Sequence, residues 1–147
     1  LVTCSSLGDA VYEVQNFVGV PMLKVDECMV EEAVSRFGNL GILATAKSAA
    51  RGTAGLIKKV AEKQGRNVKA QPFICSDAAK YASLGQEDFD RYLAEEATKH
   101  AGEVDAILVS QVSMCGLTGY LPSGSGERVL SPLSFVVDKM RKILEDK

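Results

Sequence analysis

Short apolar stretches that alternate with segments of helical periodicity are the feature that most limits what this sequence can fold into. The stretches with the length and composition of buried strands are residues 1–3, 21–25, 40–44, 68–74, 106–109 and 129–130. The segments between them carry apolar residues every three or four positions, as one face of a helix does. Because parallel strands need a long crossover connection, usually a helix, this order predicts an α/β fold. We expect parallel sheets with helices on both faces.

Capping residues and glycines set the limits of the predicted helices. Ser5 or Ser6 is the predicted N-cap of a helix that ends at Gly19, and Asp26 is the predicted N-cap of one that ends at Gly38. Further helices are predicted at residues 48–64, 76–84, 87–100 and 133–144. The apolar residues of the last helix that we expect to face the core are Val136, Val137, Met140 and Leu144. The glycine-rich stretch 116–128 is predicted to be a mobile surface loop or flap.

The composition indicates one globular domain without a nucleic-acid or membrane partner. The 147 residues are 46% hydrophobic and 24% charged, with a formal net charge of −2, which is ordinary for a globular chain. The basic residues lie on helix faces that also carry carboxylates, and there is no Trp, so neither a phosphate-binding patch nor a base-stacking platform is expected. No apolar run is as long as a membrane span, and no signal peptide is visible.

The four cysteines indicate reduced thiols. Cys4, Cys28, Cys75 and Cys115 form no CxxC pair and have no His cluster nearby, so no metal site is expected. A disulfide framework is not expected in a chain of regular helices and strands, and we therefore predict a cytoplasmic location. The chain starts at Leu1, without Met and inside a predicted strand, so we expect it to be the remnant of a longer polypeptide.

Three predicted strands end in small polar residues that suit an anion. These residues are Cys4, Ser5 and Ser6 in the first, Thr45 and Ser48 in the second, and Ser110, Gln111 and Ser113 in the third. In a parallel α/β fold the strand ends and the following helix N-termini share one edge, where backbone N–H groups attract negative charge. Such an edge suits a carboxylate or a developing enolate. A single Ser or Thr at a helix start is often only an N-cap, so the site hypothesis depends on all three ends.

Cys4 is the thiol for which a chemical role is predicted. A Cys at a strand-to-helix turn has its reactive thiolate stabilised, whereas a small buried packing residue is the alternative interpretation. Cys28, on an amphipathic helix, is expected to pack in the core, and Cys75 ends a strand at the periphery of the sheet. Cys115 lies four residues after Gln111, so both side chains can point the same way if that turn is helical.

Five short blocks of the sequence carry a resemblance to a known family. They are residues 1–6 (LVTCSS), 20–26 (VPMLKVD), 40–45 (LGILAT), 104–114 (VDAILVSQVSM) and 129–132 (VLSP). In order and spacing they resemble the aspartate/glutamate/hydantoin racemase superfamily, which also includes arylmalonate decarboxylase and maleate isomerase.

The resemblance implies two similar Rossmann-like α/β lobes, related by pseudo-twofold symmetry, with the site between them. Residues 1–38 are then the remainder of the first lobe, residues 39–130 the second lobe, and residues 131–147 a C-terminal helix that returns to the first lobe. Family members usually carry a further segment before the first cysteine, so the first lobe is expected to be truncated at its N-terminus. A homodimer is expected by the same resemblance.

The resemblance also assigns roles to the polar strand ends. In racemases of this family two cysteines face each other across the substrate and exchange its α-proton without metal or cofactor. By resemblance Cys4 is the first of these thiols, and no cofactor is expected. The residues that the resemblance implies in substrate binding are Ser5, Ser6, Thr45 and Ser48, and Ser113 is added to the predicted binding residues from its place after the third strand. The second cysteine position holds Gln111, whose amide cannot exchange protons usefully at neutral pH, which argues against a symmetric two-thiol racemisation.

The predicted function is therefore that of a cofactor-independent isomerase or racemase-like enzyme, or a decarboxylase, that acts at the carbon α to the carboxylate of a small acid. Cys4 is the predicted base or nucleophile, and Gln111 is the predicted amide donor to the substrate or its enolate. The alternative is a carboxylate-binding or regulatory protein of the same fold with reduced catalysis. A nucleophilic Cys hydrolase is a third hypothesis, for which no base partner of the thiol is visible in the sequence.

Overall fold

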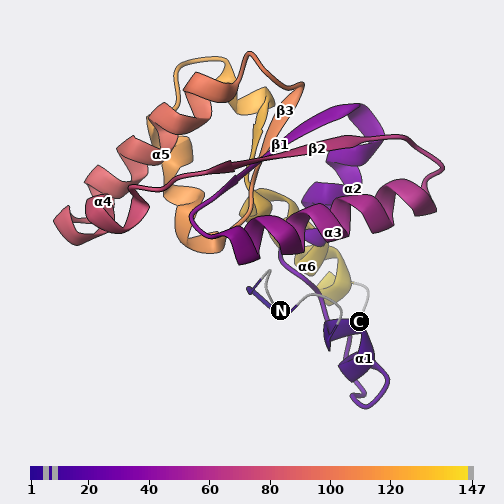
Figure 1. Ribbon diagram of the computed structural model, residues 1–147. Helices are drawn as coiled ribbons and strands as arrows, with labels where there is room; N and C mark the ends of the chain where they lie inside the picture. Colours follow the sequence, from indigo (N-terminus) through magenta and orange to yellow (C-terminus); the bar gives the residue numbers. More distant parts are fainter. Residues whose placement is uncertain (5–6, 8–9, 146–147) are drawn as a thin grey trace.

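A four-stranded parallel sheet forms the centre of the molecule (Figure 1). The structure is a computed structural model that describes residues 1–4, 7 and 10–145. The strands are β1 (Asn39–Ala44), β2 (Lys69–Ile74), β3 (Ala106–Val109) and β4 (Val129–Leu130), in the spatial order β2-β1-β3-β4. The predicted α/β fold with a parallel sheet and flanking helices is confirmed.

Alternate side chains of the central strands point to opposite faces of the sheet, as a period of two requires. One face packs against α2 (Glu27–Arg36) and α3 (Lys47–Lys63), and it receives Leu40, Ile42 and Leu108. The other face receives Leu43 and Ile107. It is covered by the helices α4 (Ala78–Leu84), α5 (Gln86–His100) and the 3-10 helix η2 (Val112–Tyr120). Both central strands are thus buried on both faces, which explains their continuous apolar sequence.

β2 lies at one edge of the sheet, with β1 as its neighbour. Its first four residues, from Lys69 to Pro72, are exposed, and only Phe73 is buried. In the register with β1, Pro72 lies beside Ile42. Pro in a strand is typical of an edge, because its missing N–H would break a ladder between two neighbours.

The N-terminal segment, which we define as residues 1–25, differs from the two strands predicted within it. The described residues of this segment make one parallel bridge, between Val2 and Lys24, and one helix, α1 (Ala10–Gln15). The predictions of strands at residues 1–3 and 21–25 are therefore wrong beyond that bridge, and the predicted first helix is shorter than expected. A lone bridge lacks the further strands that make a sheet stable, so apolar sequence alone is not sufficient for strand formation here.

Asp26 does not act as the predicted side-chain cap of α2. It occupies the N-cap position without a side-chain hydrogen bond to the helix. Its carboxylate instead lies 3.6 Å from the Nζ of Lys24, and the two side chains are 1% and 3% exposed. Burial beside a cation competes with capping for the same carboxylate, because a buried charge needs an opposite charge nearby.

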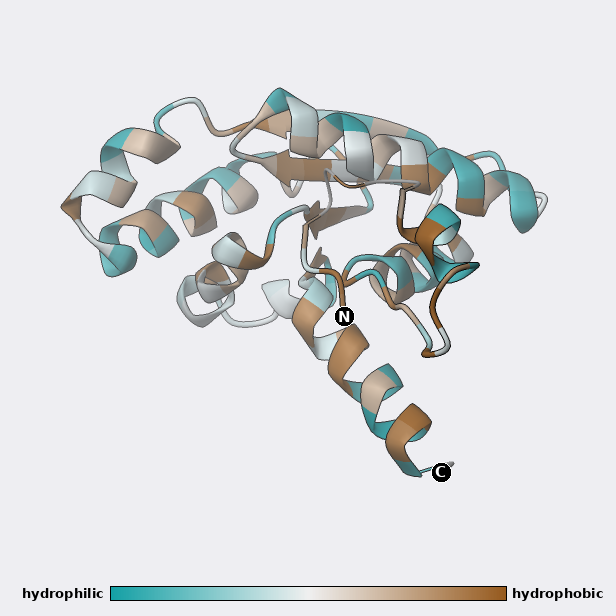
Figure 2. Ribbon diagram, turned by 90° about the horizontal axis from the view of Figure 1, so that it is seen from below, coloured by the Kyte–Doolittle hydropathy of each residue, from teal (hydrophilic) through white to brown (hydrophobic). Residues whose placement is uncertain are grey.

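The last helix, α6 (Pro132–Glu145), buries less of its surface than the sequence predicts. Val136 is buried, but Val137 and Leu144 are exposed, which corrects the predicted inward face. Figure 2 shows the helix leaving the body of the molecule with apolar segments along its exposed length. The helix packs against α2 and η2, and Leu144 near its end is 68% exposed.

The predicted flap at residues 116–128 is more ordered than a mobile loop. Its first part belongs to η2, where Met114 and Leu117 are fully buried against α5, and its second part contains the short helix η3 (Ser125–Glu127). The apolar residues of this stretch decide its structure despite the glycines around them. Across the described ranges, no helix combines the length and apolar character that a membrane span requires.

Candidate functional site

Thr45 and Gln111 meet at the carboxyl edge of the sheet. Thr45 directly follows β1, and Gln111 follows β3 by two residues, and these strands are neighbours. The backbone N–H of Thr45 donates to Oε1 of Gln111 at 3.0 Å, and the Thr45 hydroxyl donates to the same oxygen at 2.9 Å. Two of the three predicted strand ends are therefore brought into direct contact.

These two hydrogen bonds fix the orientation of the Gln111 amide. A backbone N–H can only donate, so the amide atom that faces it must be the oxygen. The Nε2 group then points away from Thr45 with two N–H donors. No described residue accepts a hydrogen bond from Nε2. Gln111 is thus a preorganised donor at the edge of the sheet, the type of group that stabilises negative charge on a ligand.

The start of α3 adds positive potential beside Thr45. The helix has Ala46 as its N-cap, no side-chain cap and no acidic residue in its first turn. Lys47 lies in this turn and Arg51 one turn later, and neither is paired with a carboxylate among the described residues. Both line a cavity of about 410 Å³ between α3 and β2. An uncapped helix N-terminus with two cations favours anions.

Cys4, the described residue of the predicted site at the first strand end, is not joined to this pair by a hydrogen bond. Cys4 is exposed, and its carbonyl accepts a hydrogen bond from the backbone N–H of Leu7 at 3.2 Å. Within the described part of the chain, no hydrogen bond connects Cys4 to Thr45 or Gln111. Ser5 and Ser6, which were predicted to bind substrate, lie outside the described residues.

The two other predicted binding residues lie near the pair but do not contact it by hydrogen bonds. Ser48 is in the first turn of α3, and Ser113 is in η2. Both are exposed, and neither hydroxyl has a hydrogen bond to a described residue. They therefore remain open to solvent and to a ligand.

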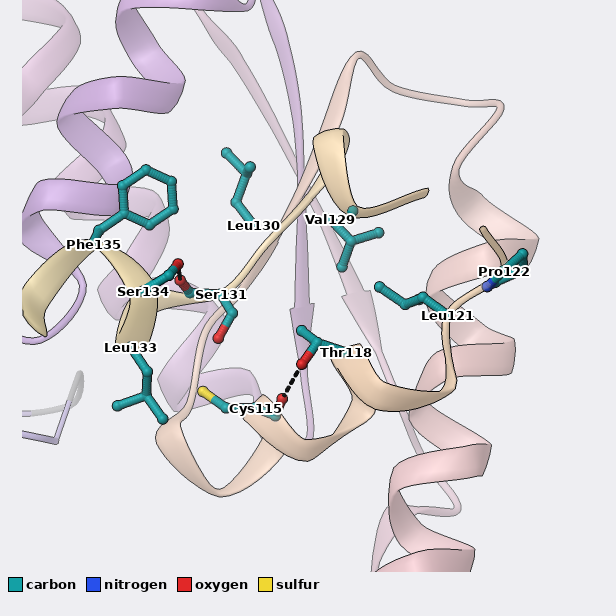
Figure 3. A pocket seen from close by; sticks show the side chains of 11 residues that line it. Cys115, Thr118, Leu121, Pro122, Val129, Leu130, Ser131, Leu133, Ser134 and Phe135 are labelled. Atoms are coloured by element: carbon teal, nitrogen blue, oxygen red, sulfur yellow. Dashed lines mark hydrogen bonds between the residues drawn. The ribbon is translucent and has the colours of Figure 1, made fainter. Parts of the chain in front are cut away.

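Cys115 lines a separate cavity beside β4 (Figure 3). The cavity has a volume of about 510 Å³ and is lined by η2, η3, β4, the start of α6 and the segments that join them. The Cys115 Sγ is 3.7 Å from the carbonyl oxygen of Gln111, to which it donates. Burial raises the pKa of the Cys115 thiol, while hydrogen bonds from the Ser131 side chain and the Leu133 backbone act in the opposite direction.

Some residues around the site were not identified from the sequence. Lys47 and Arg51 were overlooked, although the missing acid in the first turn of α3 was a visible signal. Ser131 was also overlooked as a lining residue, although it follows the short apolar pair of β4 as the other polar residues follow their strands. For the buried pair of Lys24 and Asp26 the sequence carried no signal that separates an ion pair from a helix cap.

Comparisons with known proteins place the fold but not the chemistry. No family model matches the sequence, and no curated protein matches it either. Among solved structures, glutamate racemase isoform RacE1 from Bacillus anthracis is similar, with a TM-score of 0.67 and 16% identity over 97% of this chain. The protein therefore has a racemase-like α/β fold. The chain spans about half of the length of that structure, 56% of its residues.

Proposed function

We propose that the protein binds a small carboxylic acid at the edge formed by Thr45 and Gln111 and acts at the carbon α to its carboxylate without a cofactor. The observation that carries this proposal is the fixed amide of Gln111, whose Oε1 is held by both donors of Thr45. The Nε2 group then donates to a carboxylate oxygen, and this hydrogen bond strengthens as charge develops there. The start of α3, which has no side-chain cap, also favours a negatively charged ligand.

In the proposed reaction, Cys4 is the base. Its thiolate removes the α-proton, and the electron pair of the broken C–H bond moves into the carboxylate to form an enediolate. Gln111 stabilises this enediolate, and the proton returns to the same carbon. In the decarboxylase version the broken bond is that to a second carboxylate, which leaves as CO₂, and the Cys4 thiol supplies the proton that replaces it. Ser5, Ser6, Thr45, Ser48 and Ser113 are the proposed contacts of the carboxylate.

A second candidate function is carboxylate binding with little or no turnover. The observation that favours it is again Gln111, because an amide neither accepts nor releases a proton at neutral pH. The same donor that stabilises an enolate also binds a resting carboxylate.

Proton exchange in D₂O distinguishes the two functions. The protein is incubated with L-glutamate, L-leucine or L-phenylalanine, and α-deuterium incorporation is followed by NMR. We expect exchange that is lost in Cys4→Ser, and exchange that survives this substitution contradicts the role of Cys4. Ligand-induced stabilisation in a thermal-shift assay without any exchange favours the binding protein.

Gln111→Glu tests the amide itself. The carboxylate keeps an oxygen for both Thr45 donors but replaces the Nε2 donor with a negative oxygen. Repulsion at hydrogen-bond distance is expected to weaken binding of a carboxylate by at least about tenfold. Gln111→Asn is the control, because it shortens the side chain by one methylene group but adds no charge. Unchanged affinity in Gln111→Glu would exclude the amide from the binding site.

A further inference from the structure

We infer that the cavity lined by Cys115 is the subsite for an uncharged, apolar substituent of the acid. This inference rests on the proposed function, and it names the class of substrate: small acids whose α-substituent is a branched alkyl or aromatic group.

Among the described residues that line the cavity there is no carboxylate and no basic side chain. Leu121, Val129, Leu130, Leu133 and Phe135 supply most of its walls. Figure 3 shows the polar atoms gathered at one side, where the Cys115 sulfur and the Ser131 hydroxyl approach each other. A volume of about 510 Å³ and a mainly apolar wall with a few convergent polar groups are typical of a small-molecule pocket.

The cavity adjoins the proposed carboxylate edge through one residue. Cys115 lines the cavity, and its Sγ contacts the main-chain carbonyl of Gln111 at 3.7 Å. The neighbouring strands lead to the same place, because β4 pairs with β3 and Leu108 lies beside Leu130. In the inferred arrangement, an acid that binds the Gln111 amide extends its substituent past Cys115 into this cavity.

The neutral lining selects against a second charge. A carboxylate in the cavity would lose water without gaining a cation, and such a transfer is strongly unfavourable. An apolar substituent instead gains from burial in proportion to its area. We therefore expect the protein to prefer leucine and phenylalanine to glutamate, although its structural neighbour is a glutamate racemase.

Binding of four probes tests the inference: L-leucine, L-phenylalanine, L-glutamate and acetate, each measured by calorimetric titration of the purified protein. Leucine and phenylalanine are expected to bind at least about tenfold more tightly than glutamate, as the cost of burying the extra carboxylate requires. Equal or tighter binding of glutamate overturns the inference.

A matched pair of variants on α6 tests whether the preference for leucine over glutamate arises at the cavity. Leu133→Lys places a cation at the cavity and is expected to shift the ratio of affinities towards glutamate. Leu144→Lys makes the same change on the same helix, but Leu144 does not line the cavity, so the ratio is expected to stay unchanged. A shift of equal size in both variants overturns the inference.

Alkylation of Cys115 separates failure of the subsite from failure of the proposed function. Iodoacetamide labelling, quantified by peptide mass spectrometry, is expected to slow at Cys115 when leucine is present but not when acetate is present. If leucine binds, and Gln111→Glu abolishes that binding, while Cys115 labelling is unchanged, the subsite is wrong and the proposed function stands. If none of the acids binds, both are wrong.

Discussion

The sheet unit, which we define as residues 39–130, and the N-terminal segment have similar apolar content in their predicted strands but opposite fates. In the sheet unit, Leu43 and Leu108 are fully buried between two layers of helices. In the N-terminal segment, Leu1 of the first predicted strand is 53% exposed, and Phe17 of the predicted helix is 88% exposed. Strands are stable when three or more pair into a sheet with a packed apolar face, whereas the described residues of the N-terminal segment make one bridge.

This difference separates the two halves of the proposed catalytic site. Thr45 and Gln111 belong to the sheet unit, where buried strands hold them in hydrogen-bonding contact. Cys4 belongs to the N-terminal segment, where few described contacts position it. A group that must hold a reactive geometry needs supporting contacts around it. The buried strands therefore position the proposed donor residues, and the exchange assay with Cys4→Ser tests the proposed role of the thiol.

The largest expected effect is a loss of stability on truncation of the buried sheet. Leu108→Ala is predicted to lower the free energy of unfolding by about 2–5 kcal/mol, because it leaves a cavity between well-packed layers. Phe17→Ala removes a larger side chain but is predicted to change stability by less than about 0.5 kcal/mol, because that ring is exposed. Urea unfolding of both variants measures the contrast. Comparable losses would show that the N-terminal segment is packed against something as firmly as the sheet is.

A glycine in η2 tests how tightly the sheet unit is packed beside the candidate site. Gly116→Ala places a methyl group against the carboxylate of Asp90, a buried residue of α5. We expect destabilisation of about 1–3 kcal/mol from this overlap. Gly119→Ala is the control, because a methyl group there meets no atom within 4 Å. A neutral Gly116→Ala would mean that η2 moves freely on α5.

The hydrogen bonds of Thr45 predict a smaller effect on stability together with an effect on binding. Thr45→Val removes the hydroxyl donor to Gln111 but keeps the backbone donor, and it is predicted to cost about 1 kcal/mol. Carboxylate affinity is expected to fall as well, since the amide is held less firmly. Thr45→Ser keeps the hydroxyl and is expected to restore both quantities. Calorimetric titration with L-leucine that shows wild-type affinity for Thr45→Val would contradict the positioning role.

Cys75 is predicted to have the smallest effect on the free energy of unfolding at neutral pH. The effect grows as the pH rises into the alkaline range. Burial, and secondly the charge of Glu96, raise the pKa of this thiol from 9.0 to about 12. The unfolded chain therefore releases the proton first, so the free energy of unfolding is unaffected below about pH 9 and falls as the pH rises from there towards 12. Urea titrations across this range should show a shallower decline for Cys75→Ala. An identical decline would mean that other groups, such as Cys28 and Cys115, account for it.

The parallel sheet could be predicted because its pattern is local and repeated. The strands at residues 40–44 and 106–109 are continuous apolar stretches, and α-helices lie between β1 and β2 and between β2 and β3. Thr45 and Gln111 lie close together because each follows the carboxyl end of a strand and the two strands, β1 and β3, are neighbours in the sheet. These inferences need only periodicity and the geometry of parallel crossovers.

What could not be predicted depends on contacts that a pattern does not contain. The apolar residues around Val2 and Lys24 do not reveal whether further strands lie beside them. Asp26 is equally suited to capping a helix and to pairing with a buried lysine, and the sequence cannot rank the two. The face of α6 that carries Val137 was assigned to the core because it is apolar, but burial also requires a surface to cover it.

The edge formed by β2 also bears on how the protein behaves at high concentration. An exposed edge strand is a template on which another chain can extend the sheet and begin to aggregate. Here Lys69 places a charge at the start of that strand, and Pro72 lacks the N–H that a continuous ladder would use. The opposite edge, β4, has two residues, which is too short to guide a new strand. The sheet is thus protected at both edges against growth by strand addition.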